Sequence, residues 1–248
     1  MKKAFFVFLL LIIIIITFFY STFYFFLNLQ TSNNFVNNSF RKKIISHYLL
    51  RRIFRLNQAG DARFNFAANN EFTRLKVIVY YQDGEVLYQE TIEKAVDEIK
   101  KVINKDEVII KKLPLTVLID DFTNDRKLSQ LVKKYPSKWS TSEKTAVIQV
   151  FILKKYSLHP TYAGLVKDDH NIFIFMDAIW DVSDMQKTTQ DAEVSTILHE
   201  FGHLLGANHV SNLGCIMNGK VENLIDNLPT TITTSYCPED LEEINASL

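Results

Sequence analysis

The chain has 248 residues and no formal net charge at pH 7, and 47% of its residues are hydrophobic. This length allows one sizeable domain together with an anchor, and the neutral balance gives no indication of nucleic acid as a partner. The few Gly and Pro residues exclude collagen-like and low-complexity architectures, and two cysteines exclude a disulfide-dominated scaffold.

Residues 1–29 are predicted to form a transmembrane anchor. After Lys2 and Lys3 the chain carries no charge through Leu27, and about 20 apolar residues are enough to span a bilayer as a helix. A cleaved signal peptide would have a shorter apolar region, of about 7–15 residues, followed by a small-x-small site. No such site occurs in residues 18–27. The sequence therefore favours a single-pass membrane protein over a signal peptide or a buried core helix.

Residues 30–70 are predicted to be a linker and a basic amphipathic segment. A polar, uncharged spacer, 30–39, precedes a stretch, 41–56, in which Arg and Lys are interleaved with apolar residues at helical spacing. That stretch fits either a helix on anionic lipid or an ordinary helix packed on the domain. Lys2 and Lys3 favour a cytoplasmic N-terminus, and hence an extracytoplasmic catalytic domain. The basic stretch favours the opposite orientation, although the spacer separates it from the membrane.

Residues 71–248 are predicted to form one α/β domain. Short apolar runs alternate with amphipathic stretches and end in a close pair of runs, which is typical of a mostly parallel sheet with one antiparallel edge strand. The expected strands are 75–81, 115–119, 146–153, 162–166 and 172–176, and the expected helices are 91–104, 127–135, 191–206 and 238–248.

The helix expected over 191–206 carries the residue types of a zinc site. His199 and His203 are four residues apart, so they project from the same side of this helix. Two imidazoles placed in this way can bind one metal ion, and Glu200 between them can reach a water molecule on that metal. The pattern therefore predicts a catalytic zinc with Glu200 as general base.

A third ligand is predicted beyond the end of this helix. His209 lies ten residues after His199, and it could not reach the same metal if the helix continued. Gly206 can adopt the left-handed conformation that ends a helix, so the chain can turn and bring His209 back. We therefore expect His199, His203 and His209 to bind a single Zn²⁺.

The complete pattern, His-Glu-x-x-His-x-x-Gly-x-x-His followed by Met217, resembles that of the metzincin clan of zinc peptidases. The resemblance implies a metzincin-like α/β fold with a mixed sheet, an active-site helix and a short C-terminal helix. It also implies that Met217 lies in a Met-turn beneath the zinc, as an apolar floor and not as a ligand.

Within that clan the sequence is most similar to the archaemetzincins, in which four cysteines hold a second, structural zinc. Cys215 and Cys237 match two of these positions, whereas Val210 and Asp240 stand at the other two. We therefore expect one catalytic zinc and no second zinc. Because the resemblance brings Cys215 and Cys237 together, they would form a disulfide in an oxidising space or remain free thiols in a cytoplasmic domain.

The resemblance also assigns a role to Ala163, Gly164 and Leu165. These residues would belong to the antiparallel edge strand that lines the cleft, where an extended peptide or protein substrate would add as a further strand. The alternative is a sheet edge that neighbouring loops protect.

The expected reaction is hydrolysis of peptide bonds by a zinc-dependent endopeptidase or peptidase. Zinc would activate a water molecule, and Glu200 would take the proton and pass it to the leaving amine. An additional hydrogen-bond donor normally stabilises the tetrahedral intermediate, and Tyr236, His159 and His170 are the alternatives for this role.

Two other functions remain open at the level of sequence. A gluzincin-type peptidase would use Glu222 as third ligand in place of His209, but Gly214 and Gly219 argue against the second helix that it requires. A non-catalytic metal-binding module on a membrane anchor would need no Glu200, since this residue is not a ligand.

Overall fold

The computed structural model describes residues 2–28, 40–68, 71–116, 124–180, 186–219 and 232–248. The chain divides into two compact units, Met1–Leu56 and Asn57–Leu248, which are described separately below.

The described residues of the first unit, 2–28 and 40–56, form a long apolar helix and two short helices. Helix α1 (Lys2–Asn28) contains a stretch, Phe5–Leu27, that is long and apolar enough to cross a membrane. It is followed by α2 (Lys42–Ile45) and α3 (Tyr48–Ile53). His47 between them has extended backbone angles, so the basic amphipathic segment is two short helices and not one continuous helix.

Aromatic side chains hold the end of this unit together. The ring of Phe54 stacks on Tyr20 at 5.9 Å between centroids, and it meets Phe23 edge to face at 5.6 Å. The Tyr20 hydroxyl also donates a hydrogen bond to the Ile53 carbonyl, at 3.3 Å. The residues that follow the spacer are therefore fastened to the last turns of α1.

The second unit is built on a five-stranded sheet with the order β2-β1-β3-β5-β4. Strand β1 (Arg74–Tyr81) pairs in parallel with β2 (Glu107–Pro114) and with β3 (Thr145–Leu153), and β3 pairs in parallel with β5 (Asn171–Phe175). Strand β4 (Gly164–Val166) pairs with β5 in the antiparallel direction and forms one edge. The prediction of a mostly parallel sheet with one antiparallel edge strand is confirmed.

One strand was misplaced by the sequence pattern. The prediction put a strand at 115–119, whereas the structure has β2 at Glu107–Pro114, and 117–123 lie outside the described residues. Strand β2 is the other edge of the sheet, and none of its residues is fully buried. Its lysines, Lys111 and Lys112, are typical of an exposed edge and conceal the apolar pattern of a strand.

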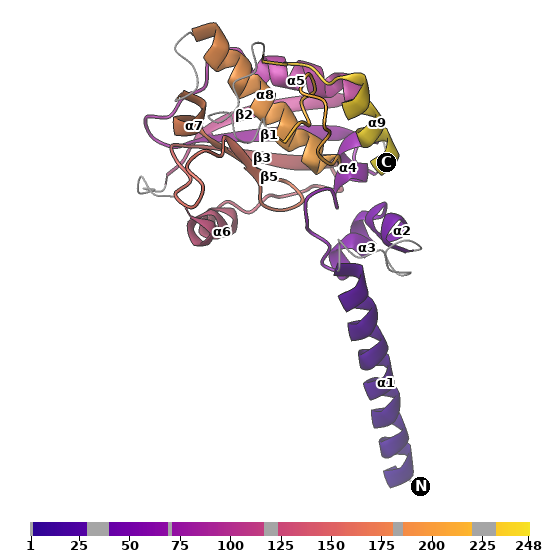
Figure 1. The fold of residues 1–248 in the computed structure, drawn as a ribbon. Helices are drawn as coiled ribbons and strands as arrows, with labels where there is room; N and C mark the ends of the chain where they lie inside the picture. The colour runs from indigo at the N-terminus through magenta and orange to yellow at the C-terminus, as the bar shows by residue number, and fades with distance from the viewer. Residues whose placement is uncertain (1, 29–39, 69–70, 117–123, 181–185, 220–231) are drawn as a thin grey trace. The chain divides into compact units, whose positions relative to one another are not determined.

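Helices cover both faces of this sheet (Figure 1). Helices α5 (Thr91–Val102) and α8 (Gln186–Leu204) lie together on one face, and α6 (Asp125–Lys134) lies on the other. The short helices α4 (Arg63–Ala67), α7 (Met176–Trp180) and α9 (Pro238–Ser247) complete the unit.

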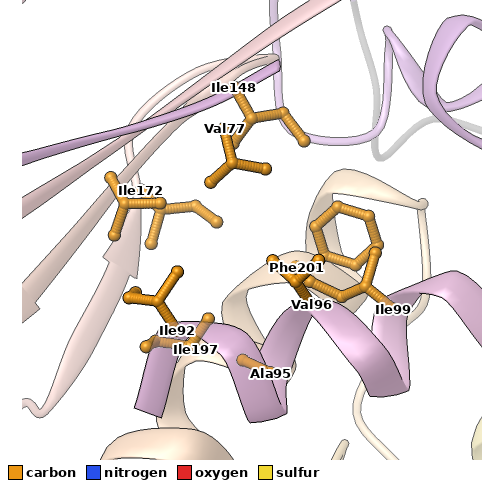
Figure 2. Close-up of a pocket in the computed structure, with 10 residues that line it drawn as sticks. Val77, Ile92, Ala95, Val96, Ile99, Ile148, Ile172, Ile197 and Phe201 are labelled. Atoms are coloured by element: carbon orange, nitrogen blue, oxygen red, sulfur yellow. The ribbon is translucent and has the colours of Figure 1, made fainter. Parts of the chain in front are cut away.

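Apolar side chains fill the layer between the sheet and helices α5 and α8. Figure 2 shows Val77, Ile148 and Ile172 of the sheet facing Ile92 and Val96 of α5. The remaining cavity has a volume of about 10 Å³, which is the least that one water molecule requires. Helix α8 therefore rests on a close-packed base.

The compact unit begins earlier than the predicted boundary at residue 71. The segment that starts at Asn57 belongs to it, because Gly60, with φ +80°, packs on Gly206 at the end of α8. The Arg63 guanidinium donates to the Ser247 carbonyl in α9, at 2.7 Å. This segment therefore joins the ends of α8 and α9, and it is not part of a linker.

A buried carboxyl group joins α8 to the start of α5. Glu193 is fully buried, and its Oε2 accepts hydrogen bonds from the Thr91 hydroxyl (2.5 Å) and the Tyr88 N–H (3.0 Å). Burial outweighs these two hydrogen bonds and raises the pKa of Glu193 from 4.5 to about 7. The folded chain thus keeps a proton that the unfolded chain has lost near pH 4.5.

We expect this carboxyl group to make stability fall as pH rises. Because its folded pKa lies above its unfolded pKa, the loss runs from about pH 4.5 to about pH 7 and amounts to roughly 3 kcal/mol at most. Thermal unfolding of the metal-free protein at pH 5 and pH 8 should show a smaller decrease in Tm for Glu193→Gln than for the unchanged chain. An equal decrease in both proteins would contradict this assignment.

Candidate metal centre

Helix α8 carries the first three residues of the site. His199 and Glu200 are buried, and His203 is partly exposed. Apolar residues of the same helix, such as Ile197 and Phe201, pack against the sheet and α5. The site residues are therefore fixed on a rigid helix.

The end of α8 turns the chain back toward these residues. Gly206 has φ +87°, and its N–H donates to the His203 carbonyl (3.0 Å) while the Ala207 N–H donates to the Gly202 carbonyl (3.0 Å). These two bonds form a Schellman motif, in which a left-handed residue ends a helix. The predicted helix end at Gly206 is confirmed, and the turn brings His209 beside the other two histidines.

The three imidazole rings face a common point. The Nε2 atom of His199 lies 3.1 Å from that of His203 and 3.3 Å from that of His209, and the ligand atoms of all three lie within 4.8 Å of one another. Two nitrogens bound to one tetrahedral zinc at about 2.0–2.1 Å are separated by roughly 3.3 Å. The two distances from His199 therefore match those of a tetrahedral zinc site, and the three histidines together fit a zinc ion.

The other ring nitrogens fix the tautomers. The Nδ1 atom of His199 lies 2.7 Å from the Ile216 carbonyl oxygen, and the Nδ1 atom of His203 lies 3.0 Å from that of Ala207. A carbonyl oxygen can only accept, so each Nδ1 carries the proton and each Nε2 presents its lone pair. This is the state in which a neutral imidazole binds a metal.

Glu200 lies directly against the edge strand β4. A Cβ atom added to Gly164 would collide with the Glu200 carboxylate, so this position of β4 accepts no side chain. The neighbouring Ala163 accepts a hydrogen bond from the Phe175 N–H (2.9 Å), and Leu165 pairs with Phe173. The structure thus brings the predicted base together with the predicted substrate strand.

Met217 packs against α8 at Gly202, the residue that precedes His203. It is fully buried, and a Cβ atom added to Gly202 would overlap its Sδ atom. The Met217 carbonyl accepts from the Val210 N–H at 2.9 Å, which ties the turn to the residue that follows His209. The expectation that Met217 forms an apolar floor beneath the zinc stays a prediction.

The two cysteines form a disulfide. Cys215 and Cys237 are joined with their Cα atoms 5.2 Å apart, which links the Met-turn to the N-cap of α9. In the chain-entropy model a closed loop of this length stabilises the fold by roughly 3 kcal/mol. Asp240, next to this bridge, is fully buried.

The three candidates for an oxyanion donor have other partners. The Tyr236 hydroxyl donates to the Leu198 carbonyl at 2.6 Å, and burial raises the pKa of Tyr236 well above its ordinary value. The Nε2 atom of His170 lies 2.6 Å from the Ser137 hydroxyl oxygen. His159 is exposed and stacks on Tyr162, with ring centroids 4.6 Å apart. None of these contacts assigns the role of oxyanion donor.

Sequence reasoning missed Gly202, and it missed the contacts that Gly164 and Asp240 make in the site. Gly202 and Gly164 make room for Met217 and Glu200, and Asp240 accepts hydrogen bonds from the Met-turn backbone. Gly202 could have been found, because glycine is a poor helix former and stands inside the predicted helix.

No protein-family model and no curated protein matches the sequence. The solved archaemetzincin of Methanopyrus kandleri matches with a TM-score of 0.52 and 12% identity, covering 72% of this chain and 96% of that chain. The archaemetzincin of Archaeoglobus fulgidus in complex with malonate has a TM-score of 0.44 and 14% identity, over 68% of this chain and 99% of that chain. A zinc-dependent peptidase from Methanocorpusculum labreanum has a TM-score of 0.47 and 14% identity, over 68% and 100%. At 12% identity, the match to the Methanopyrus kandleri archaemetzincin establishes a common fold only.

Proposed function

From the archaemetzincin-like fold that this chain has, we propose that it is a zinc-dependent peptidase that hydrolyses peptide or protein substrates. The observation that carries the proposal is the convergence of three imidazole Nε2 atoms beside a buried glutamate. Matching structures are described as archaemetzincin and as a zinc-dependent peptidase, which supports the same activity here.

The residues of the site have distinct tasks in this proposal. His199, His203 and His209 hold zinc, which when bound supplies Lewis-acid activation of water and of the substrate carbonyl. Glu200 takes the proton of the attacking water and returns it to the leaving amine. The edge strand β4 binds an extended substrate through main-chain hydrogen bonds, and Gly164 keeps that strand close to Glu200.

We propose a single zinc ion per chain. Zinc binds the thiolate form of cysteine, and both sulfur atoms near Asp240 are in the disulfide. Cys215, Cys237 and Asp240 thus occupy three of the four positions at which archaemetzincins carry the ligands of their structural zinc.

The proposal is tested by removing and restoring the metal. The protein loaded with one equivalent of zinc should cleave members of a peptide library, lose this activity on chelation, and regain it when zinc is added back. An intact library in the presence of protein-bound zinc would overturn the proposal. It would support the alternative of a non-catalytic metal-binding module.

We also propose that α1 anchors the protein in a membrane, with the catalytic unit outside the cytoplasm. Residues 1–56 contain eight of the 28 basic residues and none of the 28 acidic ones, so this unit carries a formal charge of +8 and residues 57–248 carry −8. The exposed Lys42, Lys43, Arg52 and Arg55 follow the apolar helix, and attraction of such residues to anionic lipid, by about 1 kcal/mol each, supports the anchor but not this orientation. The disulfide supports an oxidising, extracytoplasmic location.

The full-length protein should therefore remain in the membrane pellet after alkaline carbonate extraction. A chain that begins at Asn57, the start of the second compact unit, should appear in the soluble fraction and retain zinc. Release of the full-length chain by carbonate would contradict a spanning helix. It would fit a peripheral attachment, whereas a released chain shortened at its N-terminus would fit a cleaved signal sequence.

A further inference from the structure

The Asp240 carboxylate is surrounded by backbone N–H donors. Its Oδ1 accepts a hydrogen bond from the Met217 N–H at 3.0 Å, and its Oδ2 accepts from the N–H groups of Ile216 (2.9 Å) and Cys237 (3.0 Å). The side chain has no exposed surface. This carboxylate therefore fixes the backbone of the Met-turn relative to α9.

The same peptide group touches both Asp240 and a proposed zinc ligand. The peptide bond between Ile216 and Met217 donates its N–H to Asp240 and accepts the Nδ1–H of His199 at its carbonyl oxygen, 2.7 Å away. Hydrogen bonds that share one peptide group polarise each other in a low-dielectric interior. A negative charge on the N–H side thus makes the carbonyl oxygen a stronger acceptor for His199.

We propose that Asp240 is a positioning residue of the metal centre and acts on His199 through the Ile216–Met217 peptide. It holds the ring of His199 in orientation, fixes its Nδ1–H tautomer and increases the basicity of its Nε2 atom. Carboxylates that bond directly to a ligating histidine have these effects at zinc sites. Here one peptide group stands between the carboxylate and the ring. The inference rests on the zinc site proposed above.

The disulfide provides a matched control for this role. It joins the Met-turn to the start of α9, the same two segments that Asp240 joins. Removing the bridge weakens the connection between these segments but leaves the carboxylate and the peptide relay in place. Comparing loss of the disulfide with loss of the Asp240 charge therefore distinguishes a purely structural role of Asp240 from an effect on His199.

The experiment compares Asp240→Asn with the pair Cys215→Ala and Cys237→Ser. The asparagine has the same shape but lacks the charge, and its amide NH₂ cannot accept from a backbone N–H. Serine at position 237 keeps an oxygen acceptor at the N-cap of α9. Zinc Kd is measured by competition with a chelator, and the visible absorption spectrum is recorded after loading with Co²⁺.

We expect Asp240→Asn to raise the zinc Kd by about 10–100-fold, as outer-shell partners do, and to shift the Co²⁺ spectrum. The cysteine pair should lower Tm but leave the zinc Kd and the Co²⁺ spectrum unchanged. An unchanged Kd in Asp240→Asn would overturn the proposal, and so would an equal rise in both variants.

A measurement on the unchanged chain covers the case in which Asp240→Asn does not fold. The ring ¹⁵N chemical shifts of the metal-free protein should show His199 as the Nδ1–H tautomer, and an Nε2–H tautomer would refute the relay. Failure of the proposed function looks different, because the unchanged chain would then bind no zinc, or would bind zinc and cleave no peptide.

Discussion

Replacing Glu200 with glutamine should lower kcat by roughly 10²–10⁴-fold while zinc remains bound, because the change removes a general base and no ligand. Glutamine has nearly the same volume, so it should fit the buried space against Gly164 that the carboxylate occupies. Steady-state cleavage of a peptide substrate, with zinc content measured on the same sample, gives the result.

Glu193→Gln is the matched control for this substitution. Glu193 is a buried glutamate of the same helix. It accepts hydrogen bonds from the hydroxyl of Thr91, the first residue of α5, and from the N–H of Tyr88, which precedes that helix. Its replacement should leave kcat unchanged at a temperature where the chain is folded. If Glu200→Gln cleaved peptides as fast as Glu193→Gln, another group would have to act as the base.

Replacing His209 with alanine should release the metal. Three neutral imidazoles share the zinc in the proposed site, and loss of one direct ligand should cost more than the 10–100-fold in affinity that is typical of an outer-shell partner. Equilibrium dialysis against a zinc buffer measures the Kd. Activity at a fixed, low concentration of free zinc should fall in proportion to the bound metal.

His159→Ala is the control for this change. His159 is exposed and stacks on Tyr162, so its removal should leave the zinc Kd unchanged. A His209→Ala protein that holds zinc as tightly as the His159 variant would show that the third ligand is elsewhere. Glu222, the ligand of the gluzincin alternative, lies outside the described residues and would then be the residue to replace.

The parts of the site that could be predicted are those set by local spacing. His199, Glu200 and His203 follow the period of one helix, and Gly206 marks the place where that helix ends. The parallel sheet was predictable for the same reason, since most residues of β3 are apolar and the whole strand is buried. Each of these features can be predicted from residues that lie only a few positions apart in the sequence.

Non-local contacts could not be predicted in this way. The collision that keeps Gly164 without a side chain involves a residue on a distant helix, and the hydrogen bonds of Asp240 reach back to the Met-turn. Neither contact produces a periodic pattern. The resemblance to archaemetzincins singled out Asp240 as a missing cysteine, but the role of its carboxylate depends on distances that only the folded chain provides.

The bridge between Cys215 and Cys237 has a consequence for the order in which the protein is assembled. A structural zinc must be present while its domain folds, since metal binding supplies part of the folding energy. The disulfide needs an oxidising space, and neither it nor the buried carboxylate needs a metal. The loop that carries His209 and Met217 can therefore reach its place where zinc is scarce. If the chain binds one zinc, as proposed above, this ion would be the last component to arrive, and the metal-free chain would be a folded precursor that can receive it.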